Sequence, residues 1–465
     1  MKAEMASETQ KQIEQMTEAF RKKLKELYEW SNAGEVEKSP TAVEIENEIS
    51  AWIHQIGNDT QKMVLEKMDQ RRAKGKKKCP KCGEKVYWKR YEVRNYITTL
   101  GEMKLERAYY YHAACHCGWI PLDEQLGLGA SELSERVQEM VSYLGAFMPF
   151  EQAKTYLSKY CGVEISHDTV NNTTIAIGRA LKEKQEQAVQ QAWATGLLPD
   201  CAVTSPPQRL YVSADGIKHL LPDGSGKEIR VAAIYETKER QNRRGETEIH
   251  AVRITYVAHS DSEQLARAAY LIARQRGVQA AEQIVVLGDG AIWIWNRIAI
   301  LFPRQKTTEI VDFYHASEYI WDVANSVWGR ETPAAQDWGV QFCHDLKHKG
   351  PAPVLKALRK LSSSSPSVFE PVTSAITYFD NQGQRMDYPS YIERGFQIGS
   401  GSAESAVNQV VGVRMNQTGM RWNANRAEAV AHVRAAILSN RWDDFWSSFS
   451  PSLRHYNHSS LPTAA

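Results

Sequence analysis

The chain has 465 residues, of which 42% are hydrophobic and 24% are charged, and its formal net charge is +2. This composition is ordinary for a folded globular protein and excludes the disordered and fibrous classes. No apolar run approaches the roughly 18 residues that a membrane helix needs, so we expect no membrane-spanning segment. At about 100 to 200 residues per domain, the length predicts about three compact units.

Residues 1–70 are expected to form a helical N-terminal region. Apolar side chains recur every three or four residues over 8–30, which is typical of an amphipathic helix, and a second helix is expected over 42–70. The opening residues carry both charge signs and have no apolar centre, so we do not expect a secretory signal. We expect a cytoplasmic location.

Residues 71–125 are expected to form a short, basic, strand-rich module. Between Lys67 and Arg107, 14 Lys and Arg residues stand against 5 Asp and Glu residues, a local balance of +9. Such a density of positive charge attracts a polyanion such as nucleic acid, although a solvated linker is the alternative. The residues expected to contact the polyanion here are Arg71, Arg72, Lys74, Lys76, Lys77 and Lys78.

Four of the seven cysteines cluster within this module, at Cys79, Cys82, Cys115 and Cys117. The first pair has the C-x-x-C-G spacing of a zinc knuckle, and the second lies across two expected strands, as in a zinc ribbon. The second pair is C-x-C, so His112 or His116 could replace Cys115 as a ligand. We therefore expect one structural zinc ion; four unrelated buried thiols are the alternative.

Residues 126–200 return to helical periodicity. Two helix patterns, Phe150 to Lys159 and His167 to Leu181, are joined by a turn that contains Gly162, which gives this region helix-turn-helix character and predicts DNA binding. An ordinary helical hairpin is the alternative. Three prolines, at 199, 206 and 207, indicate a boundary.

From residue 205 the pattern becomes that of an α/β domain. Three strand-like runs, RLYVSADG, KEIRVAAIYETK and EIHAVRITYVAHS, precede a helix over 261–276, a strand QIVVLGDG, a short helix and a strand EIVDF. Residues 316–395 lack strand signals and are expected to be helical. This order predicts an RNase H-like catalytic domain over 205–315 and 396–446, followed by a C-terminal tail over 447–465.

Three acidic residues stand where such a domain would place catalytic groups. Asp215 is expected to end the first strand and Asp289 the fourth, while Glu404 lies in the first turn of the helix that begins with GSGSAES. Three such carboxylates can hold two Mg²⁺ (or Mn²⁺) ions for phosphodiester chemistry. Taken singly, each Asp-Gly pair could instead be a hairpin turn, and Glu404 could simply complement the helix dipole.

The motifs that carry these acids occur in a recognisable order. They are SADG around Asp215, GDGAIWIWN around Asp289, VDFYHASEYIWDVA from Val311, IGSGSAES around Glu404, and RMNQTGMRWNANRAEAVAHVRAAILSNRWDDFW. From about Cys79 to Trp446 the chain resembles the bacterial insertion-sequence DDE transposases of the Kra subgroup. The resemblance implies a transposase with Asp215, Asp289 and Glu404 as its catalytic triad and an all-helical insertion at 316–395.

The run Asp312-Phe-Tyr-His315 resembles the D-x-x-H signature of the wider Mutator-like group, which implies a supporting role near the catalytic site. The alternative is that Asp312 caps the following helix and His315 packs beside it. Arg414 and Arg421 follow the third acid and are expected to track DNA phosphates.

The resulting hypothesis is a transposase located in the prokaryotic cytoplasm with the nucleoid, without a membrane partner. It would bind the double-stranded terminal inverted repeats of its element and its target DNA, as a homodimer or higher oligomer. An RNase H-like nuclease or resolvase is the first alternative, and a non-catalytic zinc-ribbon DNA-binding regulator is the second.

Overall fold

The computed structural model of the chain describes residues 2–32, 40–73, 75–198, 206–241, 245, 247–364, 369–399 and 401–453. The chain divides into two compact units, one formed by Met1–Val137, Leu157–Glu164 and Leu453–Ala465, the other by Gln138–Tyr156 and Ile165–Ser452. Both units contain helices, and the chain has three β-sheets, so the expected mixed class of helices and sheets is confirmed. None of the helices in the described segments combines the length and hydrophobicity that crossing a membrane requires.

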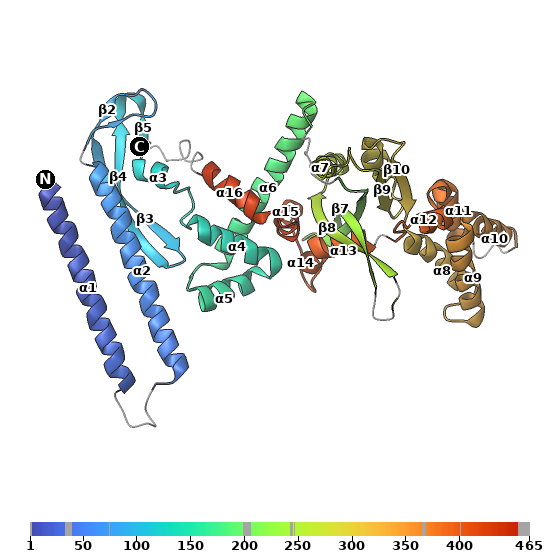
Figure 1. Ribbon diagram of the computed structural model, residues 1–465, viewed down its shortest axis with the longest axis horizontal. Helices are drawn as coiled ribbons and strands as arrows, with labels where there is room; N and C mark the ends of the chain where they lie inside the picture. The colour runs from blue at the N-terminus through green and yellow to red at the C-terminus, as the bar shows by residue number, and fades with distance from the viewer. Residues whose placement is uncertain are drawn as a thin grey trace. The chain divides into compact units, whose positions relative to one another are not determined.

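The first unit begins with two long helices, α1 (Lys2–Asn32) and α2 (Ala42–Ala73), which run side by side (Figure 1). Helix α2 packs against the hairpin of β3 (Trp88–Thr98) and β4 (Gly101–His112). Side chains alternate along β4, so that Met103 and Leu105 are buried while their neighbours are exposed. The unit also contains β1 (Lys77–Lys78), β2 (Lys85–Val86), the 3₁₀ turn η2 (Ala113–Cys115), β5 (Cys117–Trp119) and α3 (Pro121–Leu126).

The second unit is built on a five-stranded sheet in the order β10-β9-β6-β7-β8. The strands are β6 (Arg209–Leu220), β7 (Gly226–Gln241), β8 (Thr247–His259), β9 (Gln283–Gly288) and β10 (Thr307–Val311). The first three pair antiparallel, whereas β9 and β10 run parallel to β6. Every residue from Leu210 to Ala214 and from Ile284 to Gly288 is buried, because helices cover both faces of the central strands.

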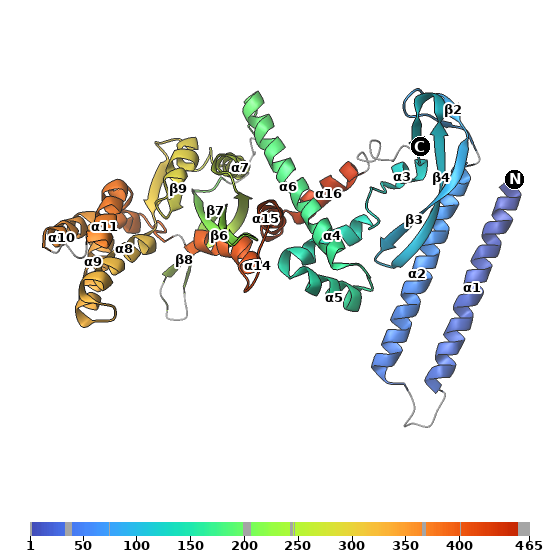
Figure 2. The same cartoon turned by 180° about the vertical axis from the view of Figure 1, so that it is seen from behind.

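Helices α8 to α12 group together beyond β10, as both views show (Figures 1 and 2). They are α8 (Phe313–Trp328), α9 (Pro333–Lys349), α10 (Pro351–Ser364), α11 (Phe369–Gln382) and α12 (Tyr388–Glu393), with the 3₁₀ turn η6 (Gly383–Arg385). The part of 316–395 that the structure describes contains no strand, as its sequence predicted.

The remaining helices lie before β6, between β8 and β10, and after α12 in the chain. They are α4 (Glu135–Phe147), α5 (Phe150–Cys161), α6 (His167–Thr195), α7 (Ser262–Gln275), η3 (Ile294–Ile298), η4 (Ala299–Leu301), α13 (Gly401–Val407), η7 (Asn408–Gly412), α14 (Val413–Met415), α15 (Ala424–Leu438) and α16 (Trp442–Leu453). Helix α6 packs so closely on α15 that a Cβ at Gly178 would meet the carbonyl oxygen of Ala429. Helix α16 extends past 447, where a C-terminal tail was expected to begin.

Candidate functional site

Three aspartates lie at the carboxyl ends of the parallel part of the sheet. The β6–β9 register ends with Ser213 opposite Leu287, and Asp215 and Asp289 each lie two residues further along. The β9–β10 register ends with Gly288 opposite Val311, so Asp312 is level with Asp289. Adjacent parallel strands therefore bring these three residues to one edge of the sheet.

The expected end of the first strand at Asp215 is wrong. Strand β6 continues to Leu220, paired with β7 as far as Gly226. Asp215 instead lies at the point where β9 stops and β6 continues with only one neighbour. The departure of β9 removes the strand neighbour that would otherwise flank the Asp215 side chain.

The pKa of Asp215 is raised to about 6, chiefly by burial and also by the negative charge of Asp289, while the N–H of Gly216 acts to lower it. The Gly216 N–H donates to Asp215 Oδ1 at 2.6 Å. The two aspartates are thus close enough for their charges to interact, in a place where solvent screens them little. Such a pair is suited to hold a divalent cation.

Helix α11 holds the turn that follows β9. The hydroxyl of Tyr378 donates to the carbonyl oxygen of Asp289 at 2.8 Å, and Nε2 of Gln382 donates to that of Gly290 at 2.8 Å. Gly290 has a φ of 103°, and a Cβ there would lie 3.0 Å from the Tyr378 ring. The ring of Tyr378 stacks on Tyr319 with centroids 4.0 Å apart. The Asp289 backbone is therefore fixed by a helix of the 316–395 block.

Asp312 caps α8, as in the alternative to a supporting role near the catalytic site. Its Oδ1 accepts hydrogen bonds from the backbone N–H groups of Tyr314 and His315, at 2.5 and 3.0 Å, and the residue is buried. The His315 ring lies edge-on to Tyr378, and its Nδ1 is 3.0 Å from Oε2 of Glu318. The charge of His315 acts to lower the pKa of Asp215, so this ring lies within electrostatic range of that carboxylate.

Glu404 lies in the first turn of α13, and its side chain is exposed. Helix α13 contacts β6 and β7, which brings the residue to the sheet that carries Asp215. Among the described residues, the structure gathers one group of potential metal ligands, the cluster described next, and Glu404 and the two aspartates do not belong to it.

That cluster consists of Cys79, Cys82, His112 and Cys115, whose ligand atoms all lie within 4.8 Å of one another. The four residues could bind a metal such as zinc, for which thiolate and imidazole are the usual ligands. The Gly83 N–H donates to the Cys79 carbonyl at 2.9 Å, which closes the tight turn of the knuckle. Burial opposes ionisation of Cys79, but the N–H groups of Cys82 and Lys81 lower its pKa to about 6.

The fourth position of this cluster differs from the expected set. Cys115 belongs to it, and His112 takes the place that was expected for Cys117, which is buried in β5. Nδ1 of His112 lies 3.3 Å from Sγ of Cys82, while its Nε2 lies 3.1 Å from a carboxylate oxygen of Glu84. A carboxylate on the second nitrogen is the usual way to orient a metal-binding imidazole. His116 lies outside the group.

The arginine expected to track DNA at 414 does not reach the surface. Arg414 is 1% exposed, and its guanidinium packs against the rings of Phe150 and Trp422, 4.8 Å from each centroid. Its Nε donates to the carbonyl of Gly145 at 3.2 Å. The prediction for Arg414 is therefore wrong, because aromatic packing and a helix carbonyl take up its charge. Arg421 is exposed and donates to the carbonyl of Pro222.

The basic residues before Cys79 are described in part. Lys76 and Lys78 are exposed, and Lys76 Nζ lies 4.8 Å from the centroid of the Tyr87 ring. Lys77 lies in β1 and is half-buried. Lys74 and the side chains of Arg71 and Arg72 lie outside the described residues.

Residues 40–442 match UPF0236, an uncharacterised protein family. The chain belongs to this family. One relative is a UPF0236 protein of Caldanaerobacter subterraneus subsp. tengcongensis, 23% identical over 384 residues, which cover 82% of this chain and 74% of the relative. Another, from Streptococcus gallolyticus, is the UPF0236 protein in the vanSb 3′ region, 27% identical over 160 residues, 34% of this chain and 32% of that protein.

Sequence reasoning missed two residues of this UPF0236 protein that contact the aspartate edge, Tyr378 and Gln382. They lie 89 and 92 residues after the groups that they bind, in a block where no motif marks them. Two polar residues at i and i+4 on one helix face were the one available signal, and that signal is common on solvent-facing helices.

Changing Tyr378 to Phe should lower the free energy of unfolding by about 1 kcal/mol. The substitution removes the hydrogen bond that fixes the Asp289 backbone, and it keeps the stacked ring. Tyr319→Phe is the matched control, since it removes a hydroxyl from the other ring of the stack. Urea denaturation measures the difference, and equal unfolding free energies for the two variants would show that the Tyr378 hydroxyl does not hold the Asp289 turn.

Proposed function

We propose that this UPF0236 protein is a metal-dependent DNA transposase whose five-stranded sheet is an RNase H-like catalytic domain. The observation that carries the proposal is the register that places Asp215 and Asp289 level on adjacent parallel strands. In an open sheet, the carboxyl ends of neighbouring parallel strands are the usual place for a site.

The strand order supports the fold assignment. Three antiparallel strands in sequence are followed by two strands parallel to the first, and the first strand lies in the middle of the sheet. This is the order expected of an RNase H-like domain. The helical block between β10 and α13 would then be the insertion that the resemblance to DDE transposases implies.

The chemistry of the acids supports Mg²⁺ as the catalytic metal. Burial and the negative charge of Asp289 raise the pKa of Asp215, the charge of His315 offsets them only in part, and a divalent ion would stabilise the charged carboxylate. Asp215 and Asp289 would hold the ions, with Glu404 reaching them from α13. When bound, such ions supply Lewis-acid activation of water and stabilise the charge that develops at the phosphodiester.

A relative's name supports the mobile-element part of the proposal. The Caldanaerobacter protein carries eleven gene designations of one strain in its name. A protein encoded many times in one genome is what an insertion sequence produces as it multiplies. The partners proposed for this chain follow: element ends and target DNA, bound by a homodimer or higher oligomer in the prokaryotic nucleoid.

The basic metal module is proposed to grip DNA phosphates. Lys76 and Lys78 are exposed beside the Cys-His cluster, where they can contact a backbone without reading sequence. The cluster would fix the turn that presents them. Its role in this proposal is structural, because its four protein ligands leave no open position for substrate.

The deciding experiment incubates the purified full chain with DNA that carries candidate element ends, with and without Mg²⁺, and maps the products. Mg²⁺-dependent nicks at the ends, followed by joining to a second DNA, are expected of a transposase. Cleavage without joining would indicate the nuclease or resolvase alternative. End binding without any cleavage would indicate the regulator.

Glu404→Gln should abolish nicking while leaving DNA binding and the melting temperature unchanged. The side chain is exposed, so the amide disturbs no packing and removes only a metal-binding charge. Nicking by each purified variant under saturating Mg²⁺ checks this. Substantial activity would move the third acid elsewhere, and Glu228, whose charge also acts on Asp215, would be tested next.

A further inference from the structure

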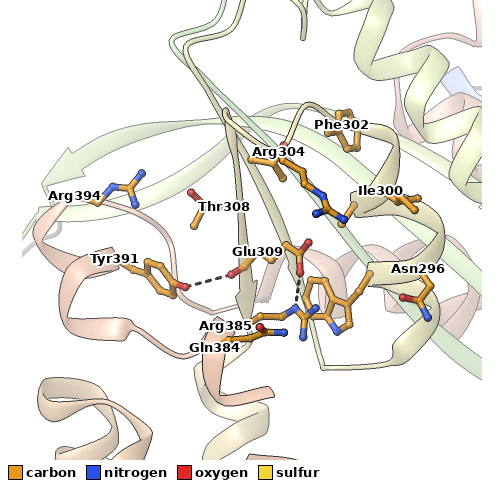
Figure 3. Close-up of a pocket in the computed structure, with 13 residues that line it drawn as sticks. Asn296, Ile300, Phe302, Arg304, Thr308, Glu309, Gln384, Arg385, Tyr391 and Arg394 are labelled. Carbon is orange, nitrogen blue, oxygen red and sulfur yellow. Dashed lines mark hydrogen bonds and ion pairs between the residues drawn. The ribbon is translucent and has the colours of Figure 1, made fainter. Parts of the chain in front are cut away.

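A polar pocket of about 630 Å³ lies against the outer edge of the sheet, at the amino-terminal half of β10 (Figure 3). Its lining includes three arginines, Arg304, Arg385 and Arg394, and one acid, Glu309. The net charge of these four side chains is +2, since three positive charges face one negative charge. The pocket belongs to the same unit as the aspartates but not to their site.

Only one of the three guanidinium groups is neutralised. Nε of Arg385 donates to Glu309 at 2.5 Å, and its guanidinium lies 4.6 Å from the centroid of the Trp295 ring. Arg304 and Arg394 form no ion pair with a carboxylate of the part of the chain that the structure describes. Arg394 instead lies over the ring of Phe396, 4.2 Å from its centroid. Two guanidinium groups are left available to a ligand.

The geometry of β10 excludes an added peptide strand. Its outward carbonyls, those of Glu309 and Val311, accept hydrogen bonds from the hydroxyls of Tyr391 and Tyr388, at 3.3 and 3.0 Å. A strand that approached this edge would find its acceptors occupied. The ligand must therefore be recognised through side chains, and the uncommitted side chains here are cationic.

We infer that this pocket binds a phosphate of the DNA backbone through Arg304 and Arg394. In the view of Figure 3 these two residues lie on either side of Thr308, whose hydroxyl could donate to the same phosphate. Planar guanidinium groups match phosphate oxygens in pairs, which favours a phosphate ligand over a neutral one. The choice of DNA as the source of that phosphate rests on the proposed function.

The position along the strand fits this assignment. Glu309 precedes Asp312 by three residues, which at the rise of a β-strand is roughly 10 Å. Phosphates of one DNA strand advance by about 3.4 Å each along the helix axis. A strand whose cleaved bond lies at the aspartates could therefore place a phosphate roughly three nucleotides away at this pocket.

The test is the salt dependence of DNA binding by the full chain, measured by fluorescence anisotropy with a labelled duplex. Arg304→Gln/Arg394→Gln should weaken binding at low salt and reduce the slope of log K against log salt by about 1, because the two side chains hold one phosphate and each lost phosphate contact removes about 0.9. Arg359→Gln is the matched control: Arg359 is also an exposed arginine, in α10, but it pairs with Asp380 at 2.8 Å. The control should keep the wild-type slope.

Equal slopes for the wild type and the double variant would overturn the inference, as would the absence of any DNA binding. Calorimetric titration with pyrophosphate separates the two sources of phosphate. Pyrophosphate binding that the double variant loses, without a change in the DNA slope, would make this a site for small phosphates and would also overturn the assignment. Failure of Mg²⁺-dependent cleavage would instead sink the proposed function and leave the slopes unaffected.

Discussion

Asp215→Asn is expected to reduce Mg²⁺-dependent DNA cleavage by about a thousandfold and, at pH 8 without metal, to raise the thermal stability of the protein. The amide keeps the volume of the carboxylate but removes a charge that would hold the metal, whose stabilisation of the transition state is worth several kcal/mol. Nicking rates and melting curves of the same preparations measure both effects.

The gain in stability follows from the raised pKa of Asp215. Its value in the folded state is about 6, against 3.8 for an exposed aspartate, so the folded protein binds this proton more tightly than the unfolded chain. Stability is therefore lost as the pH rises from about 4 to about 6, and above that range the charged carboxylate costs about 3 kcal/mol. The asparagine variant avoids this cost, so its advantage should vanish below pH 4.

Excess Mg²⁺ should make the wild type more stable than the Asp215→Asn variant at pH 8. A ligand that binds only the folded state stabilises it by mass action, and the variant has lost part of the site. Asp223→Asn is the control, because Asp223 is an exposed acid in the turn between β6 and β7. If Asp215→Asn melts at the same temperature as the wild type at every pH, and Mg²⁺ raises both melting temperatures equally, Asp215 is not a metal ligand.

His112→Ala is expected to lose the bound zinc and to unfold the module of β1 to β5, whereas Cys117→Ser should retain one equivalent of metal. Ligation by thiolates and imidazole supplies folding free energy on the order of 10 kcal/mol in small zinc modules, so the loss of one ligand is severe. Cys117 lies in β5 opposite His112 on β4, buried beside the cluster but outside it. Elemental analysis and the circular dichroism of the two variants measure the difference.

Cys343→Ser is the control for this pair, since that thiol lies in α9 of the other unit. Loss of metal from Cys117→Ser with retention in His112→Ala would restore the four-cysteine set that the sequence alone predicts. The five-stranded sheet should survive in both variants, because it shares no ligand with the cluster. Mg²⁺-dependent DNA cleavage by both variants, with the DNA held through other contacts, would check that the sheet remains folded.

The sequence predicts the strands, and it predicts that Asp215 and Asp289 lie beside each other on adjacent strands. Both features depend on local pattern and on one parallel register. Asp215 and Asp289 each follow a continuous apolar run, and burial on both faces leaves such runs little freedom to slip. The C-x-x-C knuckle is equally local. His112 and Cys117, by contrast, face each other across two strands, and their spacing alone does not say which of them points at the metal.

The features that the sequence did not predict depend on packing between residues far apart in the chain. The burial of Arg414 depends on Phe150, which lies far away in the chain, and nothing near residue 414 distinguishes a buried arginine from an exposed one. Tyr378 and Gln382 belong to α11, which is separated from the Asp289 turn along the chain by β10 and by helices α8, α9 and α10. Such contacts follow from tertiary structure, which propensity and periodicity do not encode.

The two buried arginines have a consequence for how this chain can be divided. Arg414 and Arg434 donate to the carbonyls of Gly145 and Ala146, at the end of α4, more than 260 residues earlier in the chain. A fragment that begins at the sheet would lose these acceptors together with the Phe150 and Phe147 rings that cover the two guanidinium groups. The five-stranded sheet therefore does not form an independent unit with the segment after Glu404: a chimaera between relatives would have to exchange α4 together with that segment.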